Sequence, residues 1–431
     1  MSKERSGVFC SRNFRLAFLG ALVSELGALM YSFAVSFYIL QISDNSAFLQ
    51  GLYLALCGVA MLLSTPVGGV LGDRFNKAKI MYLCDFVKGG VIIAATVLMM
   101  LFQQSPAQIA ILFALGIISD IVSGLFFPAA NSLIPDIVEE QHLQQANSFL
   151  SMKSSLENIF GIVMAGVLYS VLPIHTLFYG IGGCFIISGI SELLIVCPHN
   201  PPKESLTLRA AFRDMSDGFA YLKDHRGILT LLCSMLFINF FLSPLSSNFL
   251  PFFVSTDVAG SESYLLHGLL SPELWSSVIG VCFGVGSLAG AAVLGIKKQK
   301  DKCGREVSIR LSVMAAVILA AFLSYWLLVK VNGLLNGFLP LFCAECIALG
   351  WLISYVNIPI STTIMRTVDR DMLSKVNSML SIGSQGMIPI ASVLAGAILQ
   401  TGGSSALLLF CALGFAVTAA CLLFNKNIRE F

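Results

Sequence analysis

Long apolar runs constrain this chain more than any other feature. Hydrophobic residues make up 56% of its 431 residues and charged residues 12%, about half the charged share of ordinary soluble domains. A bilayer core about 30 Å thick takes roughly 20 helical residues per crossing, so the chain is long enough for twelve crossings. The runs predict spans at 15–40, 49–72, 80–102, 107–130, 147–171, 175–197, 227–254, 274–296, 306–330, 335–358, 377–400 and 404–425.

These spans are expected to be α-helices. Backbone groups in lipid have no water to bond, and the sequence lacks the short alternating segments of a membrane barrel. The predicted fold is therefore an all-α membrane protein with twelve transmembrane helices. Of the 26 lysines and arginines, 23 fall in segments that a cytoplasmic N-terminus would place on the inner side. The positive-inside rule predicts a multi-pass protein of the cell (inner) membrane with both termini cytoplasmic.

Short sequence matches recur about 230 residues apart. The sequence N-S-F-L-S at 147–151 returns as N-S-M-L-S at 377–381, and Pro128 has a counterpart in Pro359. Because both matches fall at corresponding span ends, they favour a duplicated six-helix unit. The predicted organisation is two pseudo-symmetric six-helix bundles, typical of secondary transporters. The bundles are expected at 1–197 and 227–431, joined by a cytoplasmic linker with an amphipathic helix at 198–226.

Several function classes receive no support. The net charge of +2 offers no basic patch for nucleic acid, and no nucleotide fingerprint is present. Ten of the twelve cysteines fall in apolar runs, where cysteine acts as a small hydrophobe, so neither a disulfide framework nor a metal site is expected. No nucleophile with an adjacent base is evident, so an enzyme and a cofactor are not expected. We expect a monomer whose partners are a small-molecule substrate and membrane lipid.

Ionisable residues at bilayer depth cost roughly 2.5–3.5 kcal/mol each on insertion scales, which makes them functional candidates. Glu25, Asp120, Glu157 and Glu345 are predicted close to the bilayer centre. Lys153 precedes Glu157 by one turn and is expected to neutralise it. The other three acids then have no basic partner in their own helices, which predicts a local charge of about −3. All five residues are predicted to couple transport to protons or to bind a cation.

Other interpretations of the buried charges stay open. In the alternative interpretation, each acid has a structural role only, in which it forms a hydrogen bond with a serine, a tyrosine or the backbone of a neighbouring helix. Asp85 and Lys88, one turn apart near the end of the third span, are expected to form a local pair. Glu192, about one turn from the end of the sixth span, is expected to snorkel to the interface.

A glycine-rich, basic turn separates the second and third spans. Its sequence is G-G-V-L-G-D-R-F-N-K-A-K at 68–79, and glycine allows a tight turn between helices. Asp73 can face a helix N-terminus, while Arg74 or Lys77 can pair with an acid, for which Asp136 is the candidate. The turn resembles the G-x-L-x-D-R-x-x-[RK]-[RK] loop of the major facilitator superfamily. The resemblance implies a conformational latch made by Gly69, Asp73, Arg74, Lys77 and Asp136.

A second motif narrows the resemblance. The sequence P-A-A-N-S-L-I-P-D-I-V at 128–138, followed by Q-A-N-S at 145–148, is similar to the branch that contains macrolide-efflux and enterobactin-exporter proteins. The likeness covers essentially the whole chain. It departs at 161–166, where G-I-V-M-A-G lacks the proline of the G-P-x-x-G-G motif that drug antiporters of the superfamily often carry.

The resemblance also implies that spans one, four, five and ten line a central cavity. Polar and aromatic residues at helical spacing are further candidates for that cavity, with ordinary helix packing favoured for the aromatic ones. The predicted substrate-cavity residues are Ser32, Ser36, Asn239, Ser243, Ser246, Trp351, Tyr355, Ser381 and Gln385.

We therefore expect a secondary transporter that works by alternating access. The resemblance favours an antiporter for efflux of amphipathic small molecules, such as macrolides, other drugs or secreted metabolites. The sequence has no ATP-binding motif, so the proton gradient is the expected energy source. Two alternatives stay open. One is an importer or facilitator of an organic solute, and the other is a non-transporting membrane receptor or scaffold.

Overall fold

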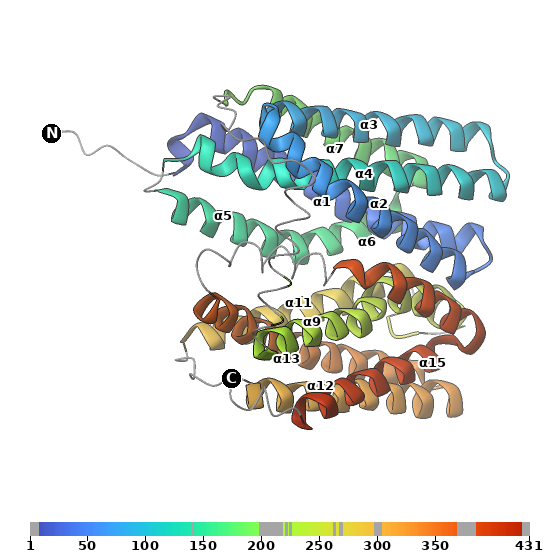
Figure 1. Cartoon of the computed structure of the whole chain (residues 1–431). Coiled ribbons are helices and arrows are strands. Elements are labelled where there is room, and N and C mark those ends of the chain that lie inside the picture. Colours follow the sequence, from blue (N-terminus) through green and yellow to red (C-terminus); the bar gives the residue numbers. More distant parts are fainter. Residues whose placement is uncertain are drawn as a thin grey trace. The chain divides into compact units, whose positions relative to one another are not determined.

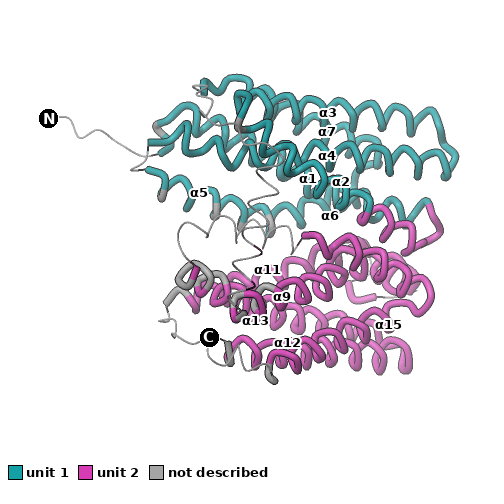
Figure 2. Tube along the Cα trace, viewed as in Figure 1, with its two compact units in different colours: residues 1–42, 56–211 teal, residues 43–55, 212–431 magenta. Residues whose placement is uncertain are grey.

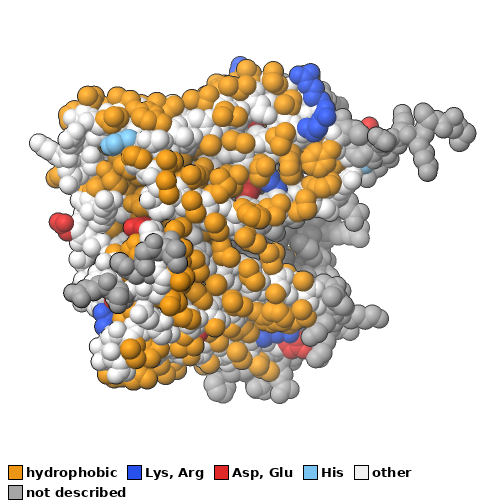
Figure 3. Space-filling view, turned by 180° about the vertical axis from the view of Figure 1, so that it is seen from behind, with side chains coloured by type: hydrophobic (Ala, Val, Ile, Leu, Met, Phe, Trp, Pro, Cys, Tyr) orange, Lys and Arg blue, Asp and Glu red, His pale blue; other side chains and the backbone are white. Residues whose placement is uncertain are grey.

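The fold is helical throughout the part of the chain that the computed structural model describes. That part comprises residues 8–139, 142–197, 219, 223, 226–261, 264–266, 270–296, 304–368 and 385–424. Every regular element in these ranges is a helix (Figure 1), as backbone in lipid requires. Apolar side chains are spread widely over the face shown in Figure 3. The predicted all-α membrane fold is confirmed.

Eleven described helical stretches are long and apolar enough to cross a membrane. One of them, Ile388–Leu422, contains Gly403, whose φ of 67° divides it into two helices. The predicted boundary between the last two spans lies at this point, so the described helices agree with twelve spans. The main elements are α1 (Arg12–Ile42), α2 (Ala47–Arg74), α3 (Lys77–Leu101), α4 (Ser105–Ile137), α5 (Leu143–Leu156), α6 (Ile162–Val171), α7 (Ile174–Leu193), α9 (Arg226–Pro244), α10 (Leu250–Phe253), α11 (Pro272–Ile296), α12 (Gly304–Ser324), α13 (Leu335–Thr367) and α15 (Ile388–Phe424).

Four π-helical segments continue these helices without a break in the chain. They are η3 (Glu157–Gly161), η4 (Leu245–Phe249), η5 (Val254–Val258) and η6 (Tyr325–Val331). Such segments are rare and occur often at functional sites. Segment η3 begins at Glu157, and segment η5 contains Asp257. Each of these acidic residues has a buried partner, which is described below.

The chain divides into two compact units (Figure 2). Unit 1 comprises residues 1–42 and 56–211, and unit 2 comprises residues 43–55 and 212–431. The first turns of α2 thus group with unit 2. The predicted linker at 198–226 lies almost wholly outside the described residues.

Glycine contacts bring helices of unit 1 close together. A Cβ on Gly89 of α3 would lie 2.8 Å from the carbonyl oxygen of Gly182 in α7. A Cβ on Gly20 of α1 would lie 3.4 Å from both Ser188 Oγ and Glu192 Cγ of α7. Because lipid tails are as apolar as the helices, small residues that permit close packing stabilise such contacts. Helices α1 and α3 therefore both pack against α7.

An aromatic cluster fills the interior of unit 2. The Phe253 ring stacks on Phe249, with centroids 5.5 Å apart, and meets Tyr325 and Phe338 edge-on. The hydroxyl group of the fully buried Tyr325 donates to Asp257 Oδ1 at 2.8 Å. A tyrosine buried in this way needs a partner for its hydroxyl group, and Asp257 supplies it.

Candidate functional site

Lys153 lies between two carboxylates inside unit 1. Its Nζ is 2.7 Å from Glu25 Oε1 and 3.4 Å from Glu157 Oε1. The side chains of Lys153 and Glu157 are each 4% exposed, whereas that of Glu25 is 35% exposed. The expected pair of Lys153 with Glu157 is therefore present, and a second, nearer acid comes from a different helix.

A change of helix type places this cation and its acids together. Lys153 lies in the last turn of α5, and Glu157 is the first residue of η3. The wider π-helical turn ends at Gly161, where a Cβ would lie 2.7 Å from Leu29 Cδ1 of α1. Glycine at this position therefore lets η3 approach the helix that carries Glu25.

Lys88 of α3 also reaches across to other helices. Its Nζ donates to Ser123 Oγ of α4 at 2.7 Å and lies 4.8 Å from the ring centroid of Phe185 in α7. It interacts electrostatically with Asp120 and with Asp85. The predicted local interaction of Lys88 with Asp85 is therefore present, and Asp120 and Ser123 of α4 share the same ammonium group.

Two of the three acids predicted to lack a cation have one nearby in unit 1. Lys153 lies beside Glu25, and Lys88 interacts with Asp120. The predicted charge of about −3 already counts Lys153, so its place beside Glu25 changes the pairing and not that charge, whereas Lys88 adds one positive charge beside Asp120. These partners come from neighbouring helices, which spacing within one helix does not reveal.

Glu345, the remaining acid of the set, belongs to α13 of unit 2. Its Oε1 accepts a hydrogen bond from Ser324 Oγ of α12 at 3.2 Å, and its Oε2 is buried without a hydrogen-bond partner. This geometry matches the alternative in which an acid bonds a serine of a neighbouring helix. Among the described residues, no group of three or more His, Cys, Asp or Glu side chains is placed to hold a metal ion.

The predicted polar cavity residues differ in their surroundings. Ser36 is buried, whereas Ser32, Ser246 and Gln385 are exposed. The Asn239 side-chain amide donates to Met235 O at 2.9 Å and Ser246 Oγ donates to Ser243 O at 3.1 Å, so both donors are used within the same helical stretch. Ser381 lies outside the described residues.

The predicted aromatic pair forms a stack in unit 2. Trp351 and Tyr355 have ring centroids 5.6 Å apart and an interplanar angle of 15°. The Arg310 guanidinium lies 4.9 Å from the Tyr355 ring and donates to its backbone carbonyl at 2.7 Å. The Tyr355 ring is thus held by two neighbours, which agrees with the favoured interpretation of helix packing.

The turn between α2 and α3 brings two of the predicted latch residues together. Lys77 Nζ lies 2.5 Å from Asp136 Oδ2 of α4 and donates to Ser132 O at 3.0 Å. Arg74 is exposed, and a Cβ on Gly69 would meet no atom within 4 Å. The side chain of Asp73 lies outside the described residues. Lys77 and Asp136 therefore supply the ion pair of this turn.

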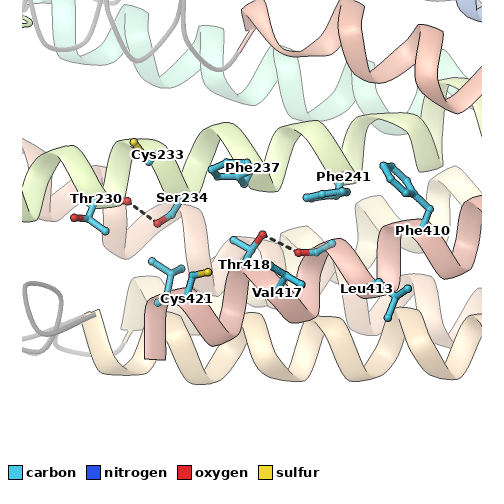
Figure 4. Close-up of a pocket in the computed structure, with 12 residues that line it drawn as sticks. Thr230, Cys233, Ser234, Phe237, Phe241, Phe410, Leu413, Val417, Thr418 and Cys421 are labelled. Atoms are coloured by element: carbon cyan, nitrogen blue, oxygen red, sulfur yellow. Dashed lines mark hydrogen bonds between the residues drawn. The ribbon is translucent and has the colours of Figure 1, made fainter. Parts of the chain in front are cut away.

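Sequence reasoning did not find an apolar cavity in unit 2. It has a volume of about 370 Å³ and lies between α9 and α15. Phe237, Phe241 and Phe410 contribute rings to it (Figure 4). A Cβ on Gly414 would collide with the Phe241 ring. Its residues are mostly apolar and lie in two apolar runs of the sequence, a pattern that does not distinguish a cavity from a packed core.

Many apolar helices, ion pairs buried among them and a charged turn at helix ends define a polytopic membrane transporter. The sequence profile of the Major Facilitator Superfamily matches residues 17–344, and the chain belongs to this superfamily. It is therefore a transporter of small molecules and not an enzyme.

Relatives confirm the narrower resemblance. The chain is 25% identical to the uncharacterized MFS-type transporter YkuC of Bacillus subtilis (strain 168), with 86% of this chain and 82% of the relative covered. It is 22% identical to Macrolide efflux protein A of Streptococcus pyogenes, with 89% of each covered. It is 26% identical to the enterobactin exporter EntS of Citrobacter koseri, with 66% of this chain and 70% of the relative covered.

The likeness to solved structures extends along nearly the whole chain. A crystal structure of the nucleoside transporter NupG superposes with a TM-score of 0.71 at 12% identity, and 96% of this chain and 98% of that chain are covered. Identity this low shows a common fold and leaves the substrate to other arguments.

Proposed function

We propose that this chain exports amphipathic small molecules in exchange for protons. Two relatives are named for export, one of macrolides and one of enterobactin. The structural observation that carries the proposal is a buried lysine shared by two acids, Glu25 and Glu157. Charges are rare inside membrane spans and mark ion or substrate pathways, so this group is our coupling site.

Glu25 is the proposed exchange group because its side chain is 35% exposed, whereas that of Glu157 is 4% exposed. A proton that binds Glu25 removes the negative charge nearest to Lys153. The ammonium group then has Glu157, 3.4 Å away, as its remaining counter-ion. When Glu25 releases the proton, its carboxylate again attracts Lys153 or a cationic group of a substrate. Proton and cation thus compete for one carboxylate.

This competition provides a two-state element. An unpaired charge in a buried site is costly, so each protonation state of Glu25 favours a different position of the Lys153 ammonium. Glu157 begins η3, and Gly161 at its end packs on α1. A shift of Lys153 toward Glu157 therefore changes the contact between α1 and η3. Differential stabilisation of two arrangements is what a coupling ion must provide.

The proposed setting is the cell membrane, with both termini in the cytoplasm and a monomer as the working unit. The distribution of basic residues supports the orientation. The inward-directed proton gradient of that membrane would then supply the energy for export. Import of an organic solute is the competing direction, and the experiment below separates the two.

The test is an accumulation assay in a host that lacks its own efflux pumps, with a macrolide and enterobactin as probes. We expect cells with the chain to accumulate less of at least one probe than cells with an empty vector, and Glu25→Gln to abolish the difference. Asp44→Asn is the matched control, because Asp44 is exposed and its φ of 52° suits asparagine.

Direction is measured in proteoliposomes with an imposed pH gradient. If the chain exports by proton exchange, the probe should move in the direction opposite to the proton flow. Raising the pH on the side with the higher proton concentration should stop the movement of the probe. The export proposal would be refuted if cells with the chain and cells with the empty vector accumulated equal amounts of each probe. Movement of probe in the same direction as protons would support the importer instead.

A further inference from the structure

Two acids of unit 1 are buried away from the Lys153 group. Asp85 lies in α3 and is almost fully buried, and Glu192 lies in the last turn of α7 with 0% of its surface exposed. The two carboxylates interact electrostatically. The expected snorkelling of Glu192 is wrong, because a fully buried side chain does not reach an interface.

Most carboxylate oxygens of this pair lack a hydrogen-bond partner. Asp85 Oδ2 and both carboxylate oxygens of Glu192 have no hydrogen-bond partner, and the Ser188 hydroxyl group interacts with the Asp85 carboxylate. Ser188 is fully buried and lies one helical turn before Glu192. A Cβ on Gly20 of α1 would lie 3.4 Å from Ser188 Oγ and from Glu192 Cγ. Ser188 and Glu192 therefore converge at the place where α1 passes.

Among the described residues, the one lysine that faces the pair compensates its charge only in part. Lys88 interacts electrostatically with Asp85 but is shared with Asp120, and its ammonium donates to Ser123 and lies over the Phe185 ring. The neighbouring Cys84 carries no compensating positive charge. Two ionised carboxylates in a buried site would therefore repel each other with only partial compensation, whereas one proton held between them removes a charge and supplies a hydrogen-bond donor.

A small cavity is lined by Asp85 of this pair and by Glu25 of the Lys153 group. It has a volume of about 30 Å³, and Asp85, Lys88, Ser123, Ser24 and Glu25 line it. The other half of its lining is apolar, formed by Ala28, Val122, Phe126, Phe127 and Phe185. The five polar side chains supply hydrogen-bond partners for the one water molecule that a cavity of this size can hold. Asp85 and Glu25 thus face the same one-water space.

We propose that Asp85 and Glu192 hold one proton between them and deliver it to Glu25, an inference that rests on the proposed proton exchange. The proton leaves the carboxyl oxygen of Asp85 for a water in the cavity, and that water gives another proton to the Glu25 carboxylate. The water is unchanged, Glu25 becomes neutral, and the acid pair gains one negative charge. The pair then accepts a new proton and is ready for the next transfer.

Infrared spectroscopy of the purified full-length chain tests the proton-holding pair without any transport. The C=O stretch of a protonated carboxyl group should be present at neutral pH and should disappear on alkaline titration. We expect Glu192→Gln and, independently, Asp85→Asn to remove this band, while Asp44→Asn leaves it unchanged. Two isosteric variants keep the test decisive if one of them does not fold.

Several results would overturn the inference. One is a band that survives in both variants, and another is a band that sodium removes at constant pH, which would assign the site to a metal cation. Delivery to Glu25 is tested in proteoliposomes, where Glu192→Gln should slow proton-coupled transport and leave substrate binding unchanged. A chain that exports neither probe yet shows the band would refute the proposed function alone. A chain that exports a probe but lacks the infrared band would refute the proton-holding pair and leave the proposed function standing.

Discussion

Glu25 Oε1 and Lys153 Nζ lie 2.7 Å apart and join α1 to α5 within unit 1. The lysine side chain is 4% exposed, so its charge depends on this acid and on Glu157 for compensation. Breaking a buried ion pair by removing one partner is more costly than removing the whole set, because the surviving charge is left uncompensated. The stability of unit 1 should therefore respond unequally to single and double substitutions here.

Lys153→Met should lower the stability of the chain by about 3–5 kcal/mol, since it leaves Glu157 as an uncompensated charge in a buried site. The double variant Lys153→Met with Glu157→Gln should recover a large part of that loss. Thermal unfolding of the purified chain in detergent measures both. Lys79→Met is the control, because Lys79 is exposed at the start of α3. An unfolding temperature of Lys153→Met equal to that of Lys79→Met would contradict the argument.

Gly161 should tolerate a small side chain and reject a large one. A Cβ there would meet the flexible end of Leu29, 2.7 Å away, which can move at little cost. Gly161→Leu should cost about 1–3 kcal/mol through overpacking and should reduce transport, because it separates η3 from α1. Gly180→Leu is the matched control, since a Cβ at Gly180 would meet no atom within 4 Å. Equal transport rates for the two leucine variants would show that this contact is not needed.

The spans could be predicted from the sequence because the physical cause is local. A run of about 20 apolar residues can cross lipid only as a helix, and a glycine with positive φ such as Gly403 ends a helix where it stands. The predicted division of the last two spans therefore agrees with the structure.

The partners of the buried charges could not be predicted because their cause is tertiary. Spacing along one helix placed Lys153 beside Glu157 but could not show that α1 brings Glu25 closer. It also paired Lys88 with Asp85 but could not show that Asp120 and Ser123 of α4 share the same ammonium group. Glu192 illustrates the same limit, because an acid near a helix end is buried or solvated according to which helix passes it, here α1 at Gly20.

The ion pair of Lys77 with Asp136 should matter more for transport than for stability. The two side chains are 20% and 37% exposed, and pairs of this kind contribute roughly 0–1 kcal/mol. Asp136→Lys should slow transport with little change in unfolding temperature, and the exchange Lys77→Asp with Asp136→Lys should restore part of the rate. Recovery stays partial because an aspartate at 77 cannot donate to the Ser132 carbonyl as Lys77 does. Full activity of the single reversal would contradict a latch role.

Asp257 should be the most sensitive polar residue of unit 2. Its carboxylate accepts from Tyr325 at 2.8 Å, from Ser404 at 2.7 Å and from Lys330 at 3.3 Å, and so joins η5, η6 and the helix that begins after Gly403. Asp257→Ala leaves the buried Tyr325 hydroxyl unsatisfied, at about 1–3 kcal/mol, and also removes the bonds from Ser404, Lys330 and Thr256. Lys330→Met should cost under about 1 kcal/mol, because that lysine is 49% exposed. Unfolding temperatures should therefore fall in the order Lys330→Met, Tyr325→Phe, Asp257→Ala, and a reversal of that order would mean that the exposed ion pair, not the buried hydroxyl, holds these helices together.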